Sequence, residues 1–301
     1  MPVERIGGDA ERAIASVAKQ DATFPFELVV ISAEALALPS EIRVRNVVEP
    51  DRNPATRRNR AVSASTGELL AFIDDDAIAD PSWLRTAAAY FDAHPEVLAL
   101  GGPDPAPPDS SDAELLSDTL LATPLIGSGV ACHENRKGIF RIRRASDIAL
   151  VNLFVRRSAF TGFDEKIGYI GEDTALLESL LERGPVVYHD GVRVFHRRRA
   201  FPGPYLRQRW RYRVKTGEML VRGSKAHRSN PRIRQFLIAG SMFILLWPLL
   251  LIPYLLGTLI LGARVTRLPM RKWGLIPFAF LAHHATYWTG IVWGMIRARL
   301  R

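Results

Sequence analysis

Two long uncharged apolar stretches near the C-terminus constrain this chain more than any other feature of its sequence. Residues 236–262 and 274–296 contain no Asp, Glu, Lys or Arg. Each exceeds the roughly 20 apolar residues that a helix needs to cross a bilayer core about 30 Å thick. The stretches therefore predict two transmembrane helices, although Pro248 and Pro253 would kink the first or make it re-entrant.

Positive charge around these stretches predicts their orientation. Lys and Arg are dense before the first stretch and recur in the C-terminal tail, while the segment between the stretches holds Arg264, Arg267, Arg271 and Lys272. Because cytoplasmic segments carry an excess of Lys and Arg, the basic segment and the tail should be cytoplasmic. This predicts a multi-pass protein of the cell (inner) membrane with its N-terminal domain in the cytoplasm. The four cations between the stretches weaken that topology.

Composition leaves several anionic partners open. The formal net charge of +9 suits nucleic acid, acidic lipid or a nucleotide diphosphate. Nucleic acid is the poorest option, because the basic run leads directly into apolar segments and is interleaved with aromatic residues, which is typical of an interfacial amphipathic helix. Cys132 is the only cysteine, so an intramolecular disulfide and a multi-cysteine zinc site are excluded.

The first two thirds of the chain alternate between strand-like and helix-like segments. The patterns predict helices over 9–20, from Pro54 after the N-cap Asn53, over 80–93 and over 172–183. Strands are expected over 27–32, 69–73, 97–101, 185–189 and 192–196, and the 69–73 run is apolar enough to be buried on both faces. Residues 103–118, rich in Pro, Asp and Ser, predict a mobile surface loop. The alternation indicates an α/β fold with a mostly parallel sheet and helices on both faces.

Three consecutive aspartates follow the strand expected over 69–73. Ligands bind at the carboxyl ends of strands in open α/β sheets, and adjacent carboxylates require a cation such as Mg²⁺ or Mn²⁺. In extended chain, Asp74 and Asp76 would address one ligand while Asp75 faces elsewhere. The alternative is a solvated turn, because Asp is common at turns.

Asp173 and His196 are further candidates. Asp173 shares a helical stripe with Leu176, Leu177 and Leu180, which would aim its carboxylate inward as a general base. Dipole compensation at the helix start explains Glu172 and Asp173 equally well. His196 ends the last expected strand, where a lone histidine is more often structural than a metal ligand.

Taken together, these segments resemble the family 2 inverting glycosyltransferases, whose catalytic domain has the GT-A fold. The resemblance covers roughly residues 1–217 and rests on the order of its motifs. They are ERAIASVAKQD (11–21), RRNRAVSASTGELLAFIDDDAIADPSWL (57–84), NLFVRRSAFTGFDE (152–165), GEDTALLESLLERG (171–184) and VFHRRRAFPGPYLRQRWRYRVKTG (194–217).

The resemblance implies roles for the matching residues. Asp173 would be the catalytic base, and Asp76 with His196 would hold Mg²⁺ or Mn²⁺. Glu172 and the interfacial segment would lie on the acceptor side. The donor-site residues would be Arg58, Asn59, Asp74, Asp75 and Asp76, and the interfacial segment Gln208, Arg209 and Trp210.

The implied partners and organisation follow from the same resemblance. A nucleotide-sugar donor, a glycan or lipid-linked acceptor and membrane lipid are expected, with no nucleic acid. The chain would comprise a GT-A catalytic domain (1–200), a basic amphipathic interfacial segment (201–234) and an α-helical membrane hairpin (235–301).

The sequence departs from the family pattern in two places. Family members usually begin with a full strand before a segment like Met1–Val3, so the pairing at that sheet position is in question. After the second strand the family has an acidic pair that contacts the base, whereas here Ser32, Ala33 and Glu34 follow. Glu34 is the residue that would substitute.

Two other functions compete with sugar transfer. An oxidoreductase with a dinucleotide cofactor is disfavoured because no G-x-G-x-x-G follows an early strand. A catalytically inactive membrane protein that binds a nucleotide or a partner would share the same fold. The donor sugar and the acceptor cannot be read from these residues.

Overall fold

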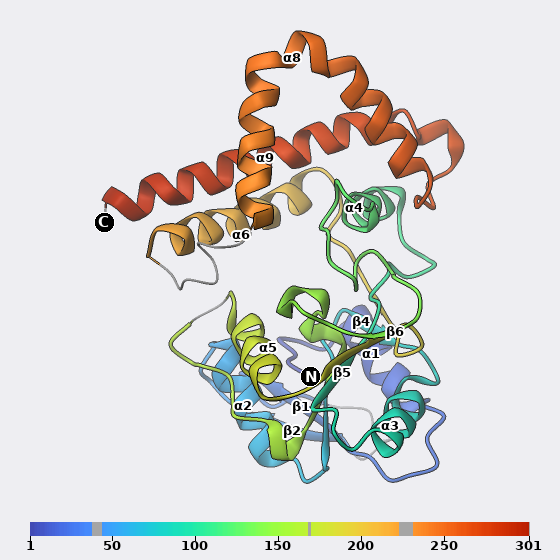
Figure 1. Cartoon of the computed structure of the whole chain (residues 1–301). Coiled ribbons are helices and arrows are strands. Elements are labelled where there is room, and N and C mark those ends of the chain that lie inside the picture. Colours follow the sequence, from blue (N-terminus) through green and yellow to red (C-terminus); the bar gives the residue numbers. More distant parts are fainter. Residues whose placement is uncertain (38–43, 168–169, 223–230, 301) are drawn as a thin grey trace. The chain divides into compact units, whose positions relative to one another are not determined.

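The computed structural model describes residues 1–37, 44–167, 170–222 and 231–300 (Figure 1). The chain forms two compact units. The sheet unit comprises Met1–Pro108 and Val130–Arg197, and the helical unit comprises Asp109–Gly129 and Arg198–Arg301.

The sheet unit contains most of the predicted helices and strands. Its helices are α1 (Gly8–Ala18), α2 (Pro54–Ala64), α3 (Trp83–Ala93) and α5 (Glu172–Arg183). Its strands are β1 (Leu28–Ser32), β2 (Val44–Val48), β3 (Leu69–Phe72), β4 (Ala77–Ala79), β5 (Ala99–Gly101), β6 (Ile139–Arg141), β7 (Leu153–Arg156), β8 (Val186–His189) and β9 (Val194–His196). Short 3-10 turns at Ala145–Asp147, Leu150–Asn152 and Arg157–Ala159 flank β7 or precede it.

The strand pairing is mixed rather than mostly parallel. Five strands are ordered β3-β7-β5-β8-β6, and β7 runs antiparallel between β3 and β5, whereas β5 and β8 are parallel. Two further pairs complete the pairing, β1 with β2 in parallel and β4 with β9 antiparallel. The sequence alternation did not predict β2, β4, β6 or β7, and so it gave no information on the direction of β7.

Two hydrophobic clusters cover opposite faces of the five-stranded sheet. Along β7, Leu153 and Val155 belong to one cluster and Phe154 to the other, as the two-residue period of a strand requires. Helices α1 and α3 pack in the cluster of Phe154, and α5 packs in the cluster of Leu153. The sheet is therefore covered on both faces, as predicted.

The structure resolves three local features of the sequence: the cap of α2, the pairing of Met1–Val3, and the burial of β3, which differs from the prediction. The Asn53 side chain accepts a hydrogen bond from the Ala55 amide and so caps α2. Met1–Val3 pairs with β1 through a hydrogen bond of 2.8 Å from the Val3 amide to the Ile31 carbonyl, which fills the sheet position left in question. β3 is buried less than predicted, since Ala71 is exposed, because β3 lies at an edge of its sheet.

The prediction of a loop over 103–118 is wrong from Asp112 onward. Residues Asp112–Ala122 form helix α4 of the helical unit. A capping box begins it, in which the Ser111 hydroxyl accepts from the Glu114 amide and the Glu114 carboxylate accepts from the Ser111 amide. The Ser-x-x-Glu spacing before a run of leucines was the available signal, and the Pro and Asp content of the segment obscured it.

The helical unit also holds the basic and apolar segments. They form α6 (Gly203–Arg222), α8 (Pro231–Ala263) and α9 (Leu275–Leu300). Among the described helices, only α8 is both long and apolar enough to cross a membrane. The second predicted span is not supported, because α9 carries a buried face, and its Gly290 and Gly294 let α6 approach at backbone distance.

Close backbone packing just after β5 generates the first prediction. A Cβ at Gly102 would lie 2.0 Å from the Val192 carbonyl oxygen, whereas a Cβ at Gly8 would contact nothing within 4 Å. We expect Gly102→Ala to lower the unfolding free energy by about 1–3 kcal/mol through overpacking. Gly8→Ala should leave it unchanged or raise it slightly. Thermal melting of the two variants checks this, and equal melting temperatures would contradict it.

Candidate active site

The three aspartates after β3 lie in a turn rather than in an extended segment. The Ala77 amide donates to the Asp74 carbonyl at 3.3 Å, and β4 begins at once. The extended-chain argument that would aim Asp74 and Asp76 at one ligand therefore does not apply. Asp74 lies against Arg58, and Asp76 lies against His196.

Arg58 joins three elements through its guanidinium. Nη1 donates to Glu172 Oε1 at 2.8 Å, and Nη2 lies 3.5 Å from Asp74 Oδ1. The Arg58 side chain is only 12% exposed, so these charges interact in a partly dehydrated setting. The ion pairs bring α2, the aspartate turn and the start of α5 into one region of the sheet unit.

Glu172, rather than Asp173, is the buried acid at the start of α5. Burial raises the pKa of Glu172, the neighbouring Asp173 raises it further, and Arg58 opposes both effects. Asp173 is half-buried, and its Oδ1 accepts a hydrogen bond of 2.7 Å from the Thr174 amide. The sequence prediction placed Asp173 on the inward stripe, but Glu172 precedes two of the same leucines, Leu176 and Leu180, by four and eight residues.

Gly171 is the N-cap residue of α5. Its φ of 106° lies in the left-handed region, where glycine is strongly favoured, and it immediately precedes the two acids. Of the two acids that follow, Glu172 contacts Arg58 and Asp173 is the more accessible.

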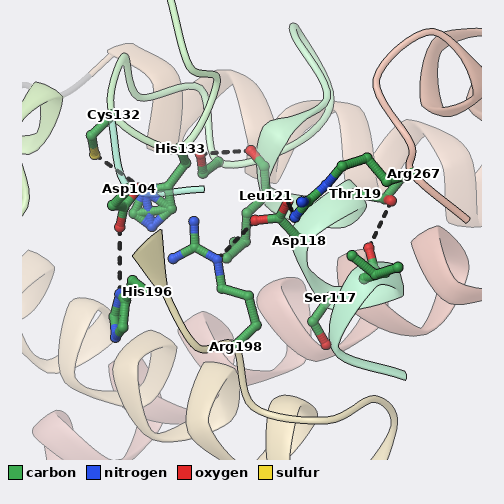
Figure 2. Close-up of polar contacts among 12 residues, drawn as sticks. Asp104, Ser117, Asp118, Thr119, Leu121, Cys132, His133, His196, Arg198 and Arg267 are labelled. Atoms are coloured by element: carbon green, nitrogen blue, oxygen red, sulfur yellow. Dashed lines mark hydrogen bonds and ion pairs between the residues drawn. The ribbon is translucent and has the colours of Figure 1, made fainter. Parts of the chain in front are cut away.

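His196 connects the aspartate turn to a second acid. The antiparallel pair of β4 and β9 places His196 opposite Ala77, and His196 Nε2 lies 3.3 Å from Asp76 Oδ1. Its Nδ1 lies 3.5 Å from Asp104 Oδ2, a contact visible in Figure 2. Asp104 is 1% exposed, so the imidazole is held between one buried and one accessible carboxylate.

Asp104 also belongs to a cluster that the sequence did not predict. His133 Nδ1 lies 3.8 Å from Asp104 Oδ1, and Cys132 Sγ lies 3.2 Å from the same ring nitrogen. One ligand-type atom from each of the three residues lies within 4.8 Å of the others. An acid two residues beyond a Gly-Gly pair at a strand end was the only signal for Asp104.

The pair of Asp76 and His196 fits a divalent cation. Two neighbouring ligands at about 2.1 Å from an octahedral metal lie about 3 Å apart, close to the observed 3.3 Å. Both side chains are roughly a quarter exposed, so ligand and solvent can reach them. A carboxylate with one imidazole suits Mn²⁺ better than Mg²⁺, which prefers oxygen alone.

The remaining predicted residues have more varied surroundings. Asn59 Nδ2 donates to the Phe163 carbonyl at 2.9 Å and to Glu165, so Asn59 fastens a loop onto α2. Glu34 is exposed beyond β1, and Asp75 is half-buried in the turn. Three others lie on α6 of the helical unit, where Arg209 donates to Gln208 Oε1 at 3.0 Å and Trp210 is 37% exposed.

The sheet unit has the fold of the GT-A glycosyltransferases. The mannosyltransferase PcManGT from Pyrobaculum calidifontis, solved with GDP-Man and Mn²⁺, is 16% identical with a TM-score of 0.51, over 95% of this chain and 85% of that chain. S. aureus TarS is 15% identical with a TM-score of 0.50, over 97% and 54% of the two chains. At such identities the likeness shows the fold alone.

The family follows from the sequence itself. A model described as glycosyl transferase family 2 matches residues 8–159, about half of the chain, and the chain belongs to this family. A glucosyl-dolichyl phosphate glucuronosyltransferase of Haloferax volcanii is 33% identical over 54 residues. That stretch spans 18% of this chain and only 17% of the relative.

The ion pairs of Arg58 with Glu172 and Asp74, called the Arg58 bridge from here on, generate a stability prediction. A raised glutamate pKa means that the folded protein holds a proton which the unfolded chain releases, so stability falls as pH rises from the ordinary glutamate pKa through the folded one. Removing Arg58 raises that pKa further and leaves the carboxylate without its cation at neutral pH. We expect Arg58→Met to lower the unfolding free energy by about 2–4 kcal/mol at pH 8, and by less at pH 5.

Two variants make this test specific. Adding Glu172→Gln to Arg58→Met should restore much of the loss at pH 8, because no buried charge is left. Arg60→Met, at an exposed position on the same helix, should change the stability little at either pH. A double variant no more stable than Arg58→Met would contradict the bridge.

Proposed function

We propose that this chain transfers a sugar, with inversion at the anomeric carbon, from a nucleotide-sugar donor to a glycan or lipid-linked acceptor at a membrane. The observation that carries the proposal is the Arg58 bridge, which joins the aspartate turn to the Glu172–Asp173 pair. Two acidic sites remote in sequence thus lie in one region, as a displacement with separate leaving-group and base functions requires.

Asp173 is the proposed base. It is more accessible than Glu172, whose carboxylate is occupied by Arg58. As the acceptor hydroxyl attacks the anomeric carbon, its proton passes to the Asp173 carboxylate, and the bond to the nucleoside diphosphate breaks. Glu172 with Arg58 then acts as a positioning pair that fixes the start of α5.

Asp76 and His196 are the proposed holders of Mn²⁺ or Mg²⁺ at the donor diphosphate. When bound, such a cation neutralises charge on the departing nucleoside diphosphate. Asp104 orients the imidazole by its contact with Nδ1, which leaves Nε2 directed at Asp76. The Mn²⁺ and GDP-Man of the Pyrobaculum structure support a metal and a nucleotide-sugar donor in this fold.

Membrane lipid and a lipid-linked acceptor are part of the proposal. The apolar helix α8 supports membrane association, and the Haloferax relative is described as acting on glucosyl-dolichyl phosphate. The catalytic domain would face the cytoplasm, where nucleotide sugars are available to it. A soluble glycan acceptor remains the alternative within the same chemistry.

Variants at the two acidic sites test the chemistry. We expect Asp173→Asn to lower sugar transfer at least 100-fold through loss of general-base assistance. Asp76→Asn should also lower transfer strongly, and part of that loss should be recovered at higher Mn²⁺. Glu182→Gln, at an exposed position on α5, should retain normal transfer. The assay measures release of nucleoside diphosphate from a panel of nucleotide sugars, using membranes that contain the full chain.

The same assay separates the proposal from an inactive binding protein. Nucleotide binding without turnover of any nucleotide sugar would favour a protein that only binds nucleotide or a partner. Near-normal transfer by both Asp173→Asn and Asp76→Asn would defeat the assigned roles.

A further inference from the structure

Helix α8 is folded back on itself. Its backbone leaves helical geometry at Leu246, with φ −113° and ψ 18°, and Pro248 and Pro253 follow within the helix. The Phe243 and Tyr254 rings lie 5.0 Å apart, although eleven residues of straight helix would separate them by about 16 Å. Figure 1 shows the two limbs of α8 meeting at a sharp bend.

Both limbs of α8 return to the same point on α9. The Phe236 ring lies 5.7 Å from the His284 ring, and Tyr254 Oη lies 2.8 Å from His284 Nδ1. Phe236 and Tyr254 would be about 27 Å apart on a straight helix. They instead mark the base of a hairpin whose tip contains Leu246 and Pro248.

The hairpin exposes apolar side chains almost everywhere beyond this base. Leu245 is 78% exposed, Leu249 is 76% exposed and Ile252 is 68% exposed. Only 6% of the most apolar part of α8 is buried. A continuous apolar surface of this kind is typical of contact with lipid or with another protein. No charged residue lies between 236 and 262 to favour a polar partner.

The first limb of the hairpin, from Phe236 to the bend, matches the depth of one leaflet of a bilayer. Leu246 lies ten residues beyond Phe236, a rise of about 15 Å along the helix. Half of a hydrocarbon core about 30 Å thick has the same depth. Neither limb is long enough to cross the whole core alone.

The segment that follows α8 is attached to α4 by polar contacts. Thr266 Oγ1 lies 2.8 Å from Thr119 Oγ1, Arg267 Nη2 lies 3.5 Å from Asp118 Oδ2, and Lys272 pairs with Asp112. Asp118 also accepts from Arg198 Nε at 2.9 Å, and Figure 2 shows both arginines directed at it.

These contacts decide on which face of the membrane α8 ends. Helix α4 is continuous in sequence with the sheet unit at both of its ends, at Pro108 and at Val130. Its contacts with the segment after α8 therefore hold that segment beside α4, a helix that the chain both enters from the sheet unit and leaves toward it. The basic helix α6 precedes α8 in sequence, and α4 and α6 both pack on α9 within the helical unit.

We propose that α8 is a re-entrant hairpin that inserts into one leaflet and leaves the membrane on the face where it entered. The cations between the apolar stretches, which oppose a two-span topology, then lie on the cytoplasmic face with the rest of the positive charge. Helices α6 and α9 lie along that face rather than across the bilayer. The proposal does not depend on the sugar-transfer chemistry.

Labelling of single cysteines in the full chain tests the topology. Cys132 is fully buried, so the unsubstituted protein serves as the blank. Met270→Cys, at a 74% exposed position after α8, and Glu182→Cys, on the exposed side of α5, should both react with a membrane-impermeant maleimide in inside-out vesicles and not in right-side-out vesicles. Reaction of Met270→Cys from the opposite face to Glu182→Cys would show that α8 spans the membrane and would overturn the proposal.

A third cysteine tests insertion. Leu249→Cys at the tip should be protected from the same reagent in both kinds of vesicle and should react after detergent is added. Reaction without detergent would show that the hairpin lies outside the bilayer and would equally overturn the proposal.

Introducing negative charge at the tip of the hairpin tests membrane insertion by a second measurement, flotation with liposomes. Leu245→Glu with Leu249→Glu should lower the fraction of protein that floats with liposomes of phosphatidylglycerol and phosphatidylethanolamine at least fivefold, since carboxylates are costly in hydrocarbon. Met270→Glu, outside the hairpin, should float like the unsubstituted protein. Unchanged flotation of the tip variant would count against insertion, and thermal melting of both variants in detergent checks that they are folded.

Discussion

The ion pairs of Arg58 hold together the part of the structure on which the proposed chemistry depends. The guanidinium lies between Glu172 and Asp74 and is largely withdrawn from water. A buried carboxylate is costly unless it is paired, so the position of Glu172 depends on α2 presenting Arg58. The side-chain cap at Asn53 fixes the start of α2 and hence the register of Arg58 on it. The ion pairs of Arg58 thereby join two acidic sites that lie about a hundred residues apart in sequence.

The other side of the site is organised by strand pairing rather than by a cation. β4 is short, but its antiparallel pairing with β9 brings His196 next to the residue that follows Asp76. Buried Asp104 then constrains the other ring nitrogen. A histidine held in this way keeps one nitrogen directed at the aspartate turn, which is the arrangement common to histidines that bind metals.

The two apolar stretches of the helical unit have different structural roles, which the sequence did not distinguish. A long apolar segment with cations on both sides fits poorly with a simple crossing of the membrane. The structure bends the segment near Leu246 and attaches the residues that follow it to α4. The second apolar stretch is buried against α6 through glycines, so its apolar residues serve protein packing in large part. Apolarity alone did not distinguish these two uses.

The sequence by itself determined most of the helices of the sheet unit, the apolar strands β1, β3, β5, β8 and β9, and the start of α2 and α5. These features depend on spacing and capping within a single element, and such signals are local. Tertiary structure decided that Glu172 is buried in place of Asp173, that Asp104 faces His196, that 112–122 is a helix, and that α8 doubles back. Each of these depends on a partner supplied by a distant segment, so the energy that selects it is absent from the local pattern.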